Sequence, residues 1–250
     1  KGKYAIGHFN VNNMEIAQAV VQGAAVQKSP VILATSQGAL KYAGLDYLFA
    51  IAKVAADSVK VPVAFHLDHG TDIDIIRKCI KKGYSSVMFD GSHLPYKKNV
   101  SMTKKIVNLA HRHGISVEAE LGTIGGAEDE IKSRKIIYTD KVQAKEFVES
   151  TGCDILAVAI GTSHGAFKFS SKAHLRFDIL QDIKKSIKTP LVLHGGSQVP
   201  KAFVTMAQKY GANLKGMRGV DPKSLQKAIS LGITKINSDF LAKSLTAFWR

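Results

Sequence analysis

Eight short runs rich in apolar and β-branched residues alternate along this chain with longer segments in which apolar residues recur at helical spacing. Strand–helix–strand units of this kind form parallel sheets, and eight parallel strands close naturally into a barrel. The alternative is an open, doubly wound sheet, but no G-x-G-x-x-G motif follows the first run. With 250 residues and 45% hydrophobic content, the chain can bury one large core. We therefore predict an α/β fold, a (β/α)8 TIM barrel in a single domain.

The bounds of the predicted elements follow from this alternation. The strands are Tyr4–Phe9, Val31–Thr35, Val61–Leu67, Ser85–Phe89, Ile115–Glu120, Asp154–Ile160, Leu191–Leu193 and Ile233–Ile236. The helices are Asn13–Gln27, Leu45–Val59, Thr71–Lys82, Tyr96–His113, Lys141–Thr151, Leu175–Ile187, Val199–Tyr210, Pro222–Leu231 and a last amphipathic segment, Phe240–Arg250. We expect Thr71 to be the N-cap of its helix, and Gly114 to end the helix that starts at Tyr96.

The segment Gly122–Tyr138 breaks the alternation. It contains three glycines and then the charged run Glu128–Glu130. Long polar loops inside compact domains often act as lids. We therefore expect this segment to be a loop that closes over a site.

The formal net charge of +15 leaves two interpretations open, a nucleic-acid partner or a small anionic substrate. Because the lysines are scattered along the helices, with no aromatic-interleaved stripe and no basic tail, we favour the small anion and expect no nucleic acid. No run of about 18 apolar residues predicts a membrane span, and Lys1 to Phe9 do not resemble a signal peptide. Cys79 and Cys153 lack zinc or redox spacing and are expected to be buried thiols, which suits a reducing, cytoplasmic setting.

Polar residues gather directly after the predicted strands. In a barrel of this kind the active site lies at the carboxyl ends of the strands, so these residues are the candidates for function. They are Asn10, Asn12, Ser36, Gln37, Asp68, Asp90, Ser92, Glu118, Glu120, Ser197, Asn237, Ser238 and Asp239. Aspartates at such positions can also be helix N-caps.

Three histidines each follow a different apolar strand, and each is followed by a glycine, which lets backbone or ligand approach closely. They are His69, His164 and His194. Three imidazoles that converge from separate strands and leave one position open make a catalytic zinc-type site. We therefore interpret these three as metal ligands. A lone histidine at a strand end is more often a hydrogen-bonded structural residue, so both interpretations stay open for His93, and structural roles are expected for His66 and His8.

Nine motifs, spread over nearly the whole chain and found in one order, give the chain a resemblance to a known family. They are GHFNVNN (7–13), SQGALKYAG (36–44), HLDHG (66–70), VMFDGSHLP (87–95), VEAELGTIGGAED (117–129), AIGTSHGAFK (159–168), LVLHGGS (191–197), LKGMRGV (214–220) and KINSD (235–239). Each motif alone is weak, but their number and order make chance agreement a poor explanation. The chain resembles the class II, metal-dependent fructose-bisphosphate and tagatose-bisphosphate aldolases.

The resemblance implies roles for individual residues. Asp68 looks like the catalytic base and His69, His164 and His194 like the ligands of a Zn²⁺ ion. Asp90 and Glu120 resemble carboxylates of a second site for a divalent or monovalent cation, and the alternative is that they support the histidines from outside. The residues implied in binding substrate and its phosphate are Ser36, Gly165, Lys168, Gly195, Ser197, Asn237 and Ser238.

Glu128 matches a lid carboxylate that the family is proposed to use for proton transfer, and its alternative role is a solvated loop charge. Asn237 is the further catalytic candidate, as a hydrogen-bond partner of the substrate. The implied enzyme is a lyase that cleaves fructose 1,6-bisphosphate reversibly to dihydroxyacetone phosphate and glyceraldehyde 3-phosphate. Tagatose 1,6-bisphosphate, which differs only at C4, is the alternative substrate. The resemblance also implies a homo-oligomer, a dimer or tetramer.

Three other classes of function remain as alternatives. A Schiff-base aldolase needs a lysine that points into the barrel, and Lys235 is the candidate. A metal-dependent hydrolase would use the same Asp68 and histidines on a phosphate ester or amide. A non-catalytic basic barrel would bind an acidic partner through its charge, but such a protein would have no need of Asp68 and three histidines.

The chain departs from the family's pattern at several places. We expect residues 1–250 to form one barrel domain that lacks the family's helix before the first strand and its C-terminal helices. Basic contacts to the distal phosphate would then be missing, with Lys243 as a weak local substitute. Gln198 stands where the family has glycine, and Phe240 begins a less polar run than the family's. These departures bear on substrate identity more than on metal binding.

Overall fold

The computed structural model describes residues 4–124, 126–128, 131–133, 136–162, 175–197, 201–211 and 219–238. For 126–128, 131–133 and part of 201–209 it describes only the path of the backbone. In chain order the elements are β1 (Ile6–Asn10), α1 (Met14–Val26), β2 (Val31–Ser36), α2 (Gln37–Ala43), α3 (Leu45–Asp57), β3 (Val63–Gly70), α4 (Ile73–Lys82), β4 (Ser86–Phe89), α5 (Tyr96–His111), β5 (Ser116–Leu121), β6 (Gly126–Glu128), β7 (Ile131–Ser133), α6 (Lys141–Thr151), β8 (Ile155–Val158), α7 (Phe177–Ser186), β9 (Leu191–Leu193), α8 (Lys201–Lys209), α9 (Pro222–Ser230) and β10 (Ile233–Ser238).

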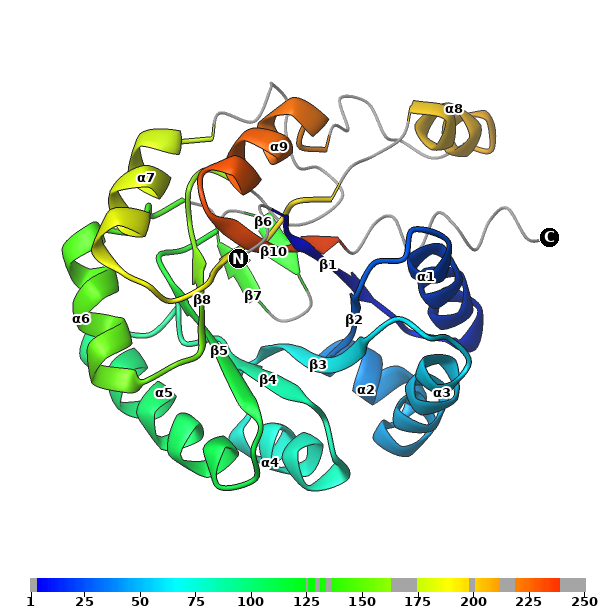
Figure 1. Cartoon of the computed structure of the whole chain (residues 1–250), viewed down its shortest axis with the longest axis horizontal. Coiled ribbons are helices and arrows are strands. Elements are labelled where there is room, and N and C mark those ends of the chain that lie inside the picture. Colours follow the sequence, from blue (N-terminus) through cyan, green and yellow to red (C-terminus); the bar gives the residue numbers. More distant parts are fainter. Residues whose placement is uncertain are drawn as a thin grey trace.

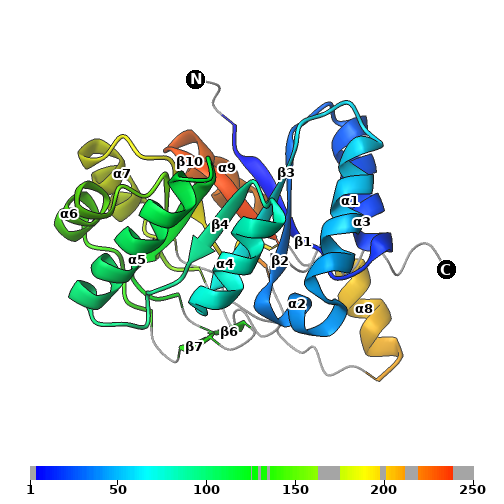
Figure 2. The same ribbon diagram turned by 90° about the horizontal axis from the view of Figure 1, so that it is seen from below.

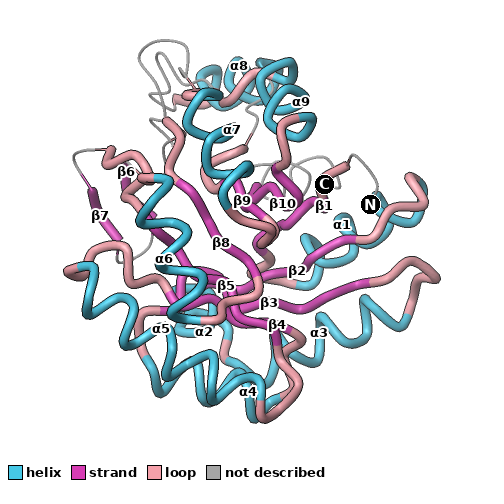
Figure 3. The backbone as a smooth tube through the Cα atoms, turned by 60° about the vertical axis from the view of Figure 1, so that its left-hand side comes forward, coloured by secondary structure: helices cyan, strands magenta, loops and turns pink. Residues whose placement is uncertain are grey.

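Eight parallel strands form a closed barrel in the order β1-β10-β9-β8-β5-β4-β3-β2. The first and last strands close it, with His8 opposite Asn237 and Ile6 opposite Lys235. Helices α1, α3, α4, α5, α6, α7 and α9 surround the strands (Figure 1). The tube view shows helices from α4 to α7 lying along the outside of the sheet one after another (Figure 3). The predicted (β/α)8 TIM barrel is confirmed.

The apolar core lies between the strands and the surrounding helices. Leu33 of β2 and Leu67 of β3 are fully buried. Leu33 packs in a cluster with α1 and α3, whereas Leu67 belongs to a larger cluster that includes residues of α4 to α7. Because successive strand residues face opposite sides of a sheet, the neighbours of these leucines face the barrel interior. On β3 those neighbours are His66 and Asp68, both buried, so the interior is polar.

Side-chain caps start several of the helices by accepting hydrogen bonds from backbone N–H groups that lack an intrahelical partner. They are Asn13 for α1, Asp72 for α4, Asp140 for α6 and Asp221 for α9. The prediction of Thr71 as the cap of α4 is wrong by one residue. Thr71 Oγ1 instead accepts from Gln37 Nε2 at 3.0 Å, while Asp72 accepts from Asp74 N at 2.7 Å.

Two further differences concern short elements. The sequence placed no helix directly after the second strand, but Ser36 caps the seven-residue helix α2 by accepting from Ala39 N at 3.2 Å. The expected loop Gly122–Tyr138 contains the antiparallel hairpin β6–β7, and Thr123 pairs with Ile137 at its base. Figure 2 shows this hairpin at the end of the barrel opposite the N-terminal residues.

Helix α5 ends at His111, and Gly114 turns the chain with a φ of +68°.

Both cysteines are buried and free of disulfides, as predicted. Burial raises the pKa of Cys79 to about 12 and that of Cys153 to about 11, so both side chains remain protonated thiols at neutral pH. Within the described ranges, no helix has the length and apolarity needed to cross a bilayer.

Candidate metal centre

A β-bulge in β3 brings two consecutive residues, Asp68 and His69, to one place. Between Leu67 and Gly70 the strand advances three residues while β4 advances two, from Val87 to Phe89. His69 takes a left-handed backbone with a φ of +45°, which is costly for a residue with a side chain and is found mostly at functional sites. Asp68 and His69 are 1% and 6% exposed. The bulge therefore lets neighbours that would face opposite sides both enter the site.

Gly70 is required by this bulge. A Cβ atom at position 70 would lie 2.6 Å from the backbone oxygen of Met88. The glycine after His69 therefore allows close approach of two strands, as the sequence indicated. Gly195, the glycine after His194, has a φ of +64°, a conformation that favours glycine.

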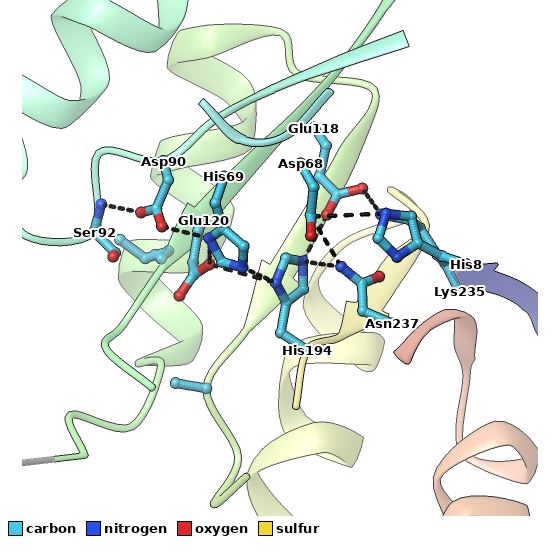
Figure 4. A network of polar contacts seen from close by, with 12 residues as sticks. His8, Asp68, His69, Asp90, Ser92, Glu118, Glu120, His194, Lys235 and Asn237 are labelled. Atoms are coloured by element: carbon cyan, nitrogen blue, oxygen red, sulfur yellow. Dashed lines mark hydrogen bonds and ion pairs between the residues drawn. The ribbon is translucent and has the colours of Figure 1, made fainter. Parts of the chain in front are cut away.

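The rings of His69 and His194 face each other across the barrel interior (Figure 4). Nε2 of His69 lies 2.8 Å from Nδ1 of His194, and the rings meet edge to face. The opposite nitrogen of each ring contacts a carboxylate: His69 Nδ1 donates to Asp90 at 2.7 Å, and His194 Nε2 donates to Glu118 at 2.7 Å. An ionised carboxylate can only accept a hydrogen bond. The proton therefore lies on Nδ1 of His69 and on Nε2 of His194, and this fixes the tautomer of each ring. Both facing nitrogens are then left with lone pairs directed at each other.

Two lone pairs at that distance repel unless a cation lies between them. Burial and the neighbouring His69 ring lower the pKa of His194, so a proton is poorly held there. A metal ion accepts lone pairs from neutral imidazoles, and metal-bound histidines commonly donate their other N–H to a carboxylate. The donor set therefore fits a divalent metal.

Two acidic side chains flank this pair of rings and differ in charge state. Burial alone would raise the pKa of Asp90, but the hydrogen bonds from His69 and Ser92 outweigh it and lower the pKa. Burial and the charge of Asp90 raise the pKa of Glu120 well above its usual range. Glu120 Oε2 lies 3.8 Å from His69 Nδ1 and 3.9 Å from His194 Nδ1, with no hydrogen-bond partner among the described residues. Ligand atoms of His69, Asp90 and Glu120 lie within 4.8 Å of one another.

A buried ion pair supports His194 from the other side. Lys235 Nζ donates to Glu118 Oε2 at 2.6 Å, and both side chains are almost fully buried. Burial alone would raise the pKa of Glu118, but the Lys235 ammonium and the hydrogen bond from His194 lower it well below the usual range. Glu118 is therefore an ionised acceptor for His194.

Asp68 is held by two amides that come from the strands closing the barrel. Asn10 Nδ2 of β1 donates to Oδ2 at 3.0 Å, and Asn237 Nδ2 of β10 donates to Oδ1 at 3.1 Å. All three residues are buried. Asp68 also groups with His69 and His194 as a set of ligand atoms within 4.8 Å. The carboxylate is thus fixed beside the two imidazoles (Figure 4).

The structure places the other predicted site residues around this centre. Ser36 ends β2 opposite Asp68 in register and caps α2, and Ser238 ends β10 opposite Phe9. Gly195 and Ser197 follow His194 and are buried. Other predicted positions lie outside the described residues: His164, Gly165, Lys168, Gln198, Lys243 and the side chain of Glu128.

Comparison with known proteins decides the family. A family model described as class II fructose-bisphosphate aldolase matches residues 1–247. The chain belongs to the class II fructose-bisphosphate aldolase family. This is a family of metal-dependent lyases, and the lone-pair geometry of His69 and His194 agrees with that chemistry.

Named relatives of this aldolase chain are similar over most of their length. Fructose-bisphosphate aldolase of Giardia intestinalis is 46% identical over 242 residues, which cover 96% of this chain and 75% of that protein. The Thermus caldophilus enzyme of the same name is 44% identical over 238 residues, covering 94% and 78%. Among solved structures, the YdjI aldolase of Escherichia coli K12 superposes with a TM-score of 0.74 at 35% identity, covering 94% of this chain and 75% of that one. A putative fructose-1,6-bisphosphate aldolase of Coccidioides immitis gives 0.79 at 28%, covering 95% and 77%.

Three residues of this aldolase chain take part in the site in ways that the sequence did not assign. Asn10 and Glu118 were candidates only by their position at strand ends, and Lys235 was only the candidate nucleophile of a Schiff-base aldolase. Alternation along the strands could have placed Asn10 and Glu118 on the interior face, because each lies two residues from another interior position. Their partners could not be predicted, since they come from strands far away in the sequence.

Proposed function

We propose that this chain cleaves fructose 1,6-bisphosphate reversibly to dihydroxyacetone phosphate and glyceraldehyde 3-phosphate with a bound Zn²⁺ ion. The observation that supports it most is the pair of imidazole nitrogens of His69 and His194, 2.8 Å apart, with tautomers fixed by carboxylates. Relatives at 46% and 44% identity carry the name fructose-bisphosphate aldolase. Together these support this substrate over tagatose bisphosphate.

His69 and His194 would hold the ion, and His164 would complete the set of three imidazoles. Three histidine ligands with one open position are typical of catalytic zinc, which is why we propose zinc. A dication there supplies a Lewis acid that stabilises the negative charge developing on the substrate as its C3–C4 bond breaks. Asp90 would orient His69, and Glu120, whose carboxyl faces both rings, would be the side chain nearest a second cation.

Asp68 would act as the base that takes the proton of the C4 hydroxyl during cleavage and returns it during condensation. The Asn10 and Asn237 amides hold its two oxygens at 3.0 and 3.1 Å. A fixed carboxylate needs no reorganisation when the substrate binds, which favours proton transfer at a defined atom. Asn237 would also reach the substrate, because its Nδ2 lies 3.1 Å from Asp68 Oδ1 and 3.3 Å from His194 Nε2 (Figure 4).

The phosphate of the dihydroxyacetone half would bind at the carboxyl ends of β9, β10 and β2 and to the segment that follows β8 in the sequence. TIM barrels commonly bind phosphate after strands seven and eight of the barrel, which are β9 and β10 here. Small residues with accessible N–H and hydroxyl groups suit an oxyanion. The residues proposed for this role are Ser36, Gly165, Lys168, Gly195, Ser197 and Ser238. Glu128 is proposed to move a proton from the lid.

The Schiff-base alternative is disfavoured by the position of Lys235. Its ammonium donates to Glu118 at 2.6 Å and is buried. An ammonium in an ion pair has no lone pair with which to attack a carbonyl. The lysine therefore fits a role in fixing Glu118 better than a role as nucleophile.

The other proposals concern the setting of the enzyme. Two buried free thiols suit a reducing compartment, so we propose the cytoplasm. We also propose a homo-oligomer, a dimer or tetramer, with a small phosphorylated sugar as its ligand.

The test is the release of triose phosphate by the purified protein, with fructose or tagatose 1,6-bisphosphate as substrate. The protein is assayed as purified, after chelation, and after Zn²⁺ is added back. We expect cleavage of the fructose compound that chelation abolishes and zinc restores. Cleavage that persists in the metal-free protein would overturn the mechanism, and preference for the tagatose compound would overturn the substrate.

A further inference from the structure

A second group of potential ligands lies on the other side of Asp68 from the His69–His194 pair. Figure 4 shows Asp68 between that pair and His8. Ligand atoms of His8, His66 and Asp68 all lie within 4.8 Å of one another. His8 Nε2 is 3.7 Å from Asp68 Oδ1, and the His8 and His66 rings meet edge to face with centroids 5.4 Å apart. These three residues, called the inner triad below, come from β1 and β3.

Three of the four imidazole nitrogens of the inner triad lack a hydrogen bond among the described residues. Both ring nitrogens of His8 and Nε2 of His66 are buried without a hydrogen bond there. His8 is 0% exposed and His66 1% exposed. A buried polar atom without a partner costs roughly 1–3 kcal/mol, so three such atoms in one place indicate that an additional group completes the site.

The charges around the inner triad permit a cation as that group. Among the described residues, four buried carboxyl side chains face the interior, and Lys235 is the single buried ammonium beside them. The four are Asp68, Asp90, Glu118 and Glu120. The Lys235 charge is engaged by Glu118 at 2.6 Å. Burial and the charge of Asp90 keep Glu120 protonated, so the three ionised carboxylates balance Lys235 and one dication between His69 and His194. The unpartnered imidazole nitrogens beside Asp68, rather than net charge, therefore favour a second ion.

The imidazoles of the inner triad are also in the form that binds metals. Burial, and then the charge of Lys235, lower the pKa of both His8 and His66. Neutral rings present a lone pair. His66 Nδ1 contacts the Ser86 hydroxyl at 2.7 Å, which directs its other nitrogen, Nε2, toward the interior. The Lys235 ammonium disfavours a cation here, so we expect a weaker site than the one between His69 and His194.

We propose that the inner triad binds a second divalent metal ion, and that this ion inhibits the enzyme. Its carboxylate ligand is Asp68, the proposed base, and a carboxylate bound to a dication cannot accept a proton. Two imidazoles and one carboxylate suit Zn²⁺, Cu²⁺, Ni²⁺ or Co²⁺ rather than Mg²⁺ or Ca²⁺, which prefer oxygen ligands. The inhibition rests on the proposed aldolase function, whereas the binding of the second ion does not.

The first experiment measures binding without using activity. Metal-free wild-type protein, His8→Leu and His8→Ala are dialysed against rising Zn²⁺, and bound zinc per chain is measured by elemental analysis. His8→Leu keeps the buried volume, so it guards against misfolding of the smaller variant. The matched control is His111→Ala, because His111 is a partly exposed surface histidine paired with Asp154. We expect wild type and His111→Ala to bind one weaker ion more per chain than either His8 variant, and all four proteins to keep the ion between His69 and His194.

The second experiment reads inhibition as a ratio. For each protein, triose phosphate release with excess zinc is divided by its own release with one equivalent. The ratio should fall severalfold in wild type and His111→Ala and stay near one in His8→Leu. One bound ion in wild type, or a weaker ion that His8→Leu retains, would overturn the proposal and show a surface ion instead. Absence of any cleavage would contradict the proposed function and leave the binding result to decide the site.

Discussion

Among the residues that the structure describes, two pairs of histidines lie in the interior of the barrel, and their surroundings differ. In the pair His69 and His194, the nitrogen that faces away from the centre donates to a carboxylate at 2.7 Å in each case. In the pair His8 and His66, Nδ1 of His66 contacts the hydroxyl of Ser86, and neither ring nitrogen of His8 has a hydrogen bond among the described residues. Both pairs are buried to a similar degree. The difference therefore lies in their partners rather than in their depth.

The carboxylate partners make His69 and His194 the pair better suited to bind a metal ion. A carboxylate on the outer nitrogen fixes the tautomer, holds the ring in place and makes the inner nitrogen a stronger donor. His69 and His194 have this support, and Glu118 is in turn held by Lys235. The pair His8 and His66 lacks such a carboxylate, so it should bind a metal ion more weakly and fill only at a higher metal concentration.

Asp68 lies between the two pairs, and its replacement should have the largest effect. Asp68→Asn keeps the shape but cannot take a proton, so cleavage should fall about 10²–10⁴-fold, the range for loss of a general base. Zinc bound between His69 and His194 should remain. The measurement is kcat for triose phosphate release together with bound zinc per chain, and Asp57→Asn on the surface is the control. A loss smaller than about tenfold would show that Asp68 is not the base.

Lys235 compensates the charge of Glu118, and removing it should reduce stability. Lys235→Met leaves a buried carboxylate without its cation, which should lower the free energy of unfolding by about 3–5 kcal/mol. The double variant Lys235→Met/Glu118→Gln should recover much of that loss, because the unpaired charge is gone. The surface variant Lys53→Met should change stability by less than about 1 kcal/mol. Denaturant unfolding of the metal-free proteins measures all three, and equal effects of the two lysines would refute the assignment.

Glu118 supports His194, so its neutral replacement should weaken the metal site. Glu118→Gln still offers an oxygen to His194 Nε2 but has no charge. Loss of such an outer partner typically costs about 10–100-fold in metal affinity. Competition with a chromophoric chelator gives the dissociation constant, with the exposed Glu149→Gln as control. Unchanged affinity would mean that Glu118 does not act through His194.

Asn10 supports the base, and its loss should have the smallest effect of the four. Asn10→Ala removes one of two amide contacts to Asp68 while Asn237 retains the other. A hydrogen bond to a charged group contributes about 1.5–3 kcal/mol, so we expect roughly a tenfold lower kcat at the lower end of that range. KM and zinc affinity should change little. Asn108→Ala on the surface of α5 is the control, and a change in KM alone would point to substrate binding instead.

Much of the fold was predictable because buried parallel strands are short, apolar and separated by helical spacing. The eight strands all appear near their expected places. The helix α2 was missed because it has only seven residues and its N-cap, Ser36, is also the polar end of the second strand. Thr71 and Asp72 are both residue types that cap helices well. Asp72 caps α4 because the Thr71 hydroxyl already accepts a hydrogen bond from the side chain of Gln37. That contact joins residues 34 apart and is not visible in local sequence.

The site was predictable in its residue types but not in its contacts. The sequence singled out His69 and His194 through their position after strands and before glycines. Asp68 and His69 both enter the site because of a bulge, and this bulge depends on the register between β3 and β4. The support of His194 by Glu118 and Lys235 joins β9, β5 and β10, which only barrel closure brings together. The roles of His164, Gly165, Lys168 and Glu128 remain predictions from the family resemblance.

The most direct test of the account is the position of the metal itself. Crystals of the protein grown with one equivalent of Zn²⁺ would be measured by anomalous diffraction at the zinc edge. We expect one strong peak at bonding distance, about 2.0–2.1 Å, from Nε2 of His69 and Nδ1 of His194. Asp90 and Glu118 should keep their contacts on the outer nitrogens. A peak bound first to the inner triad, or to the outer nitrogens of His69 and His194, would contradict it.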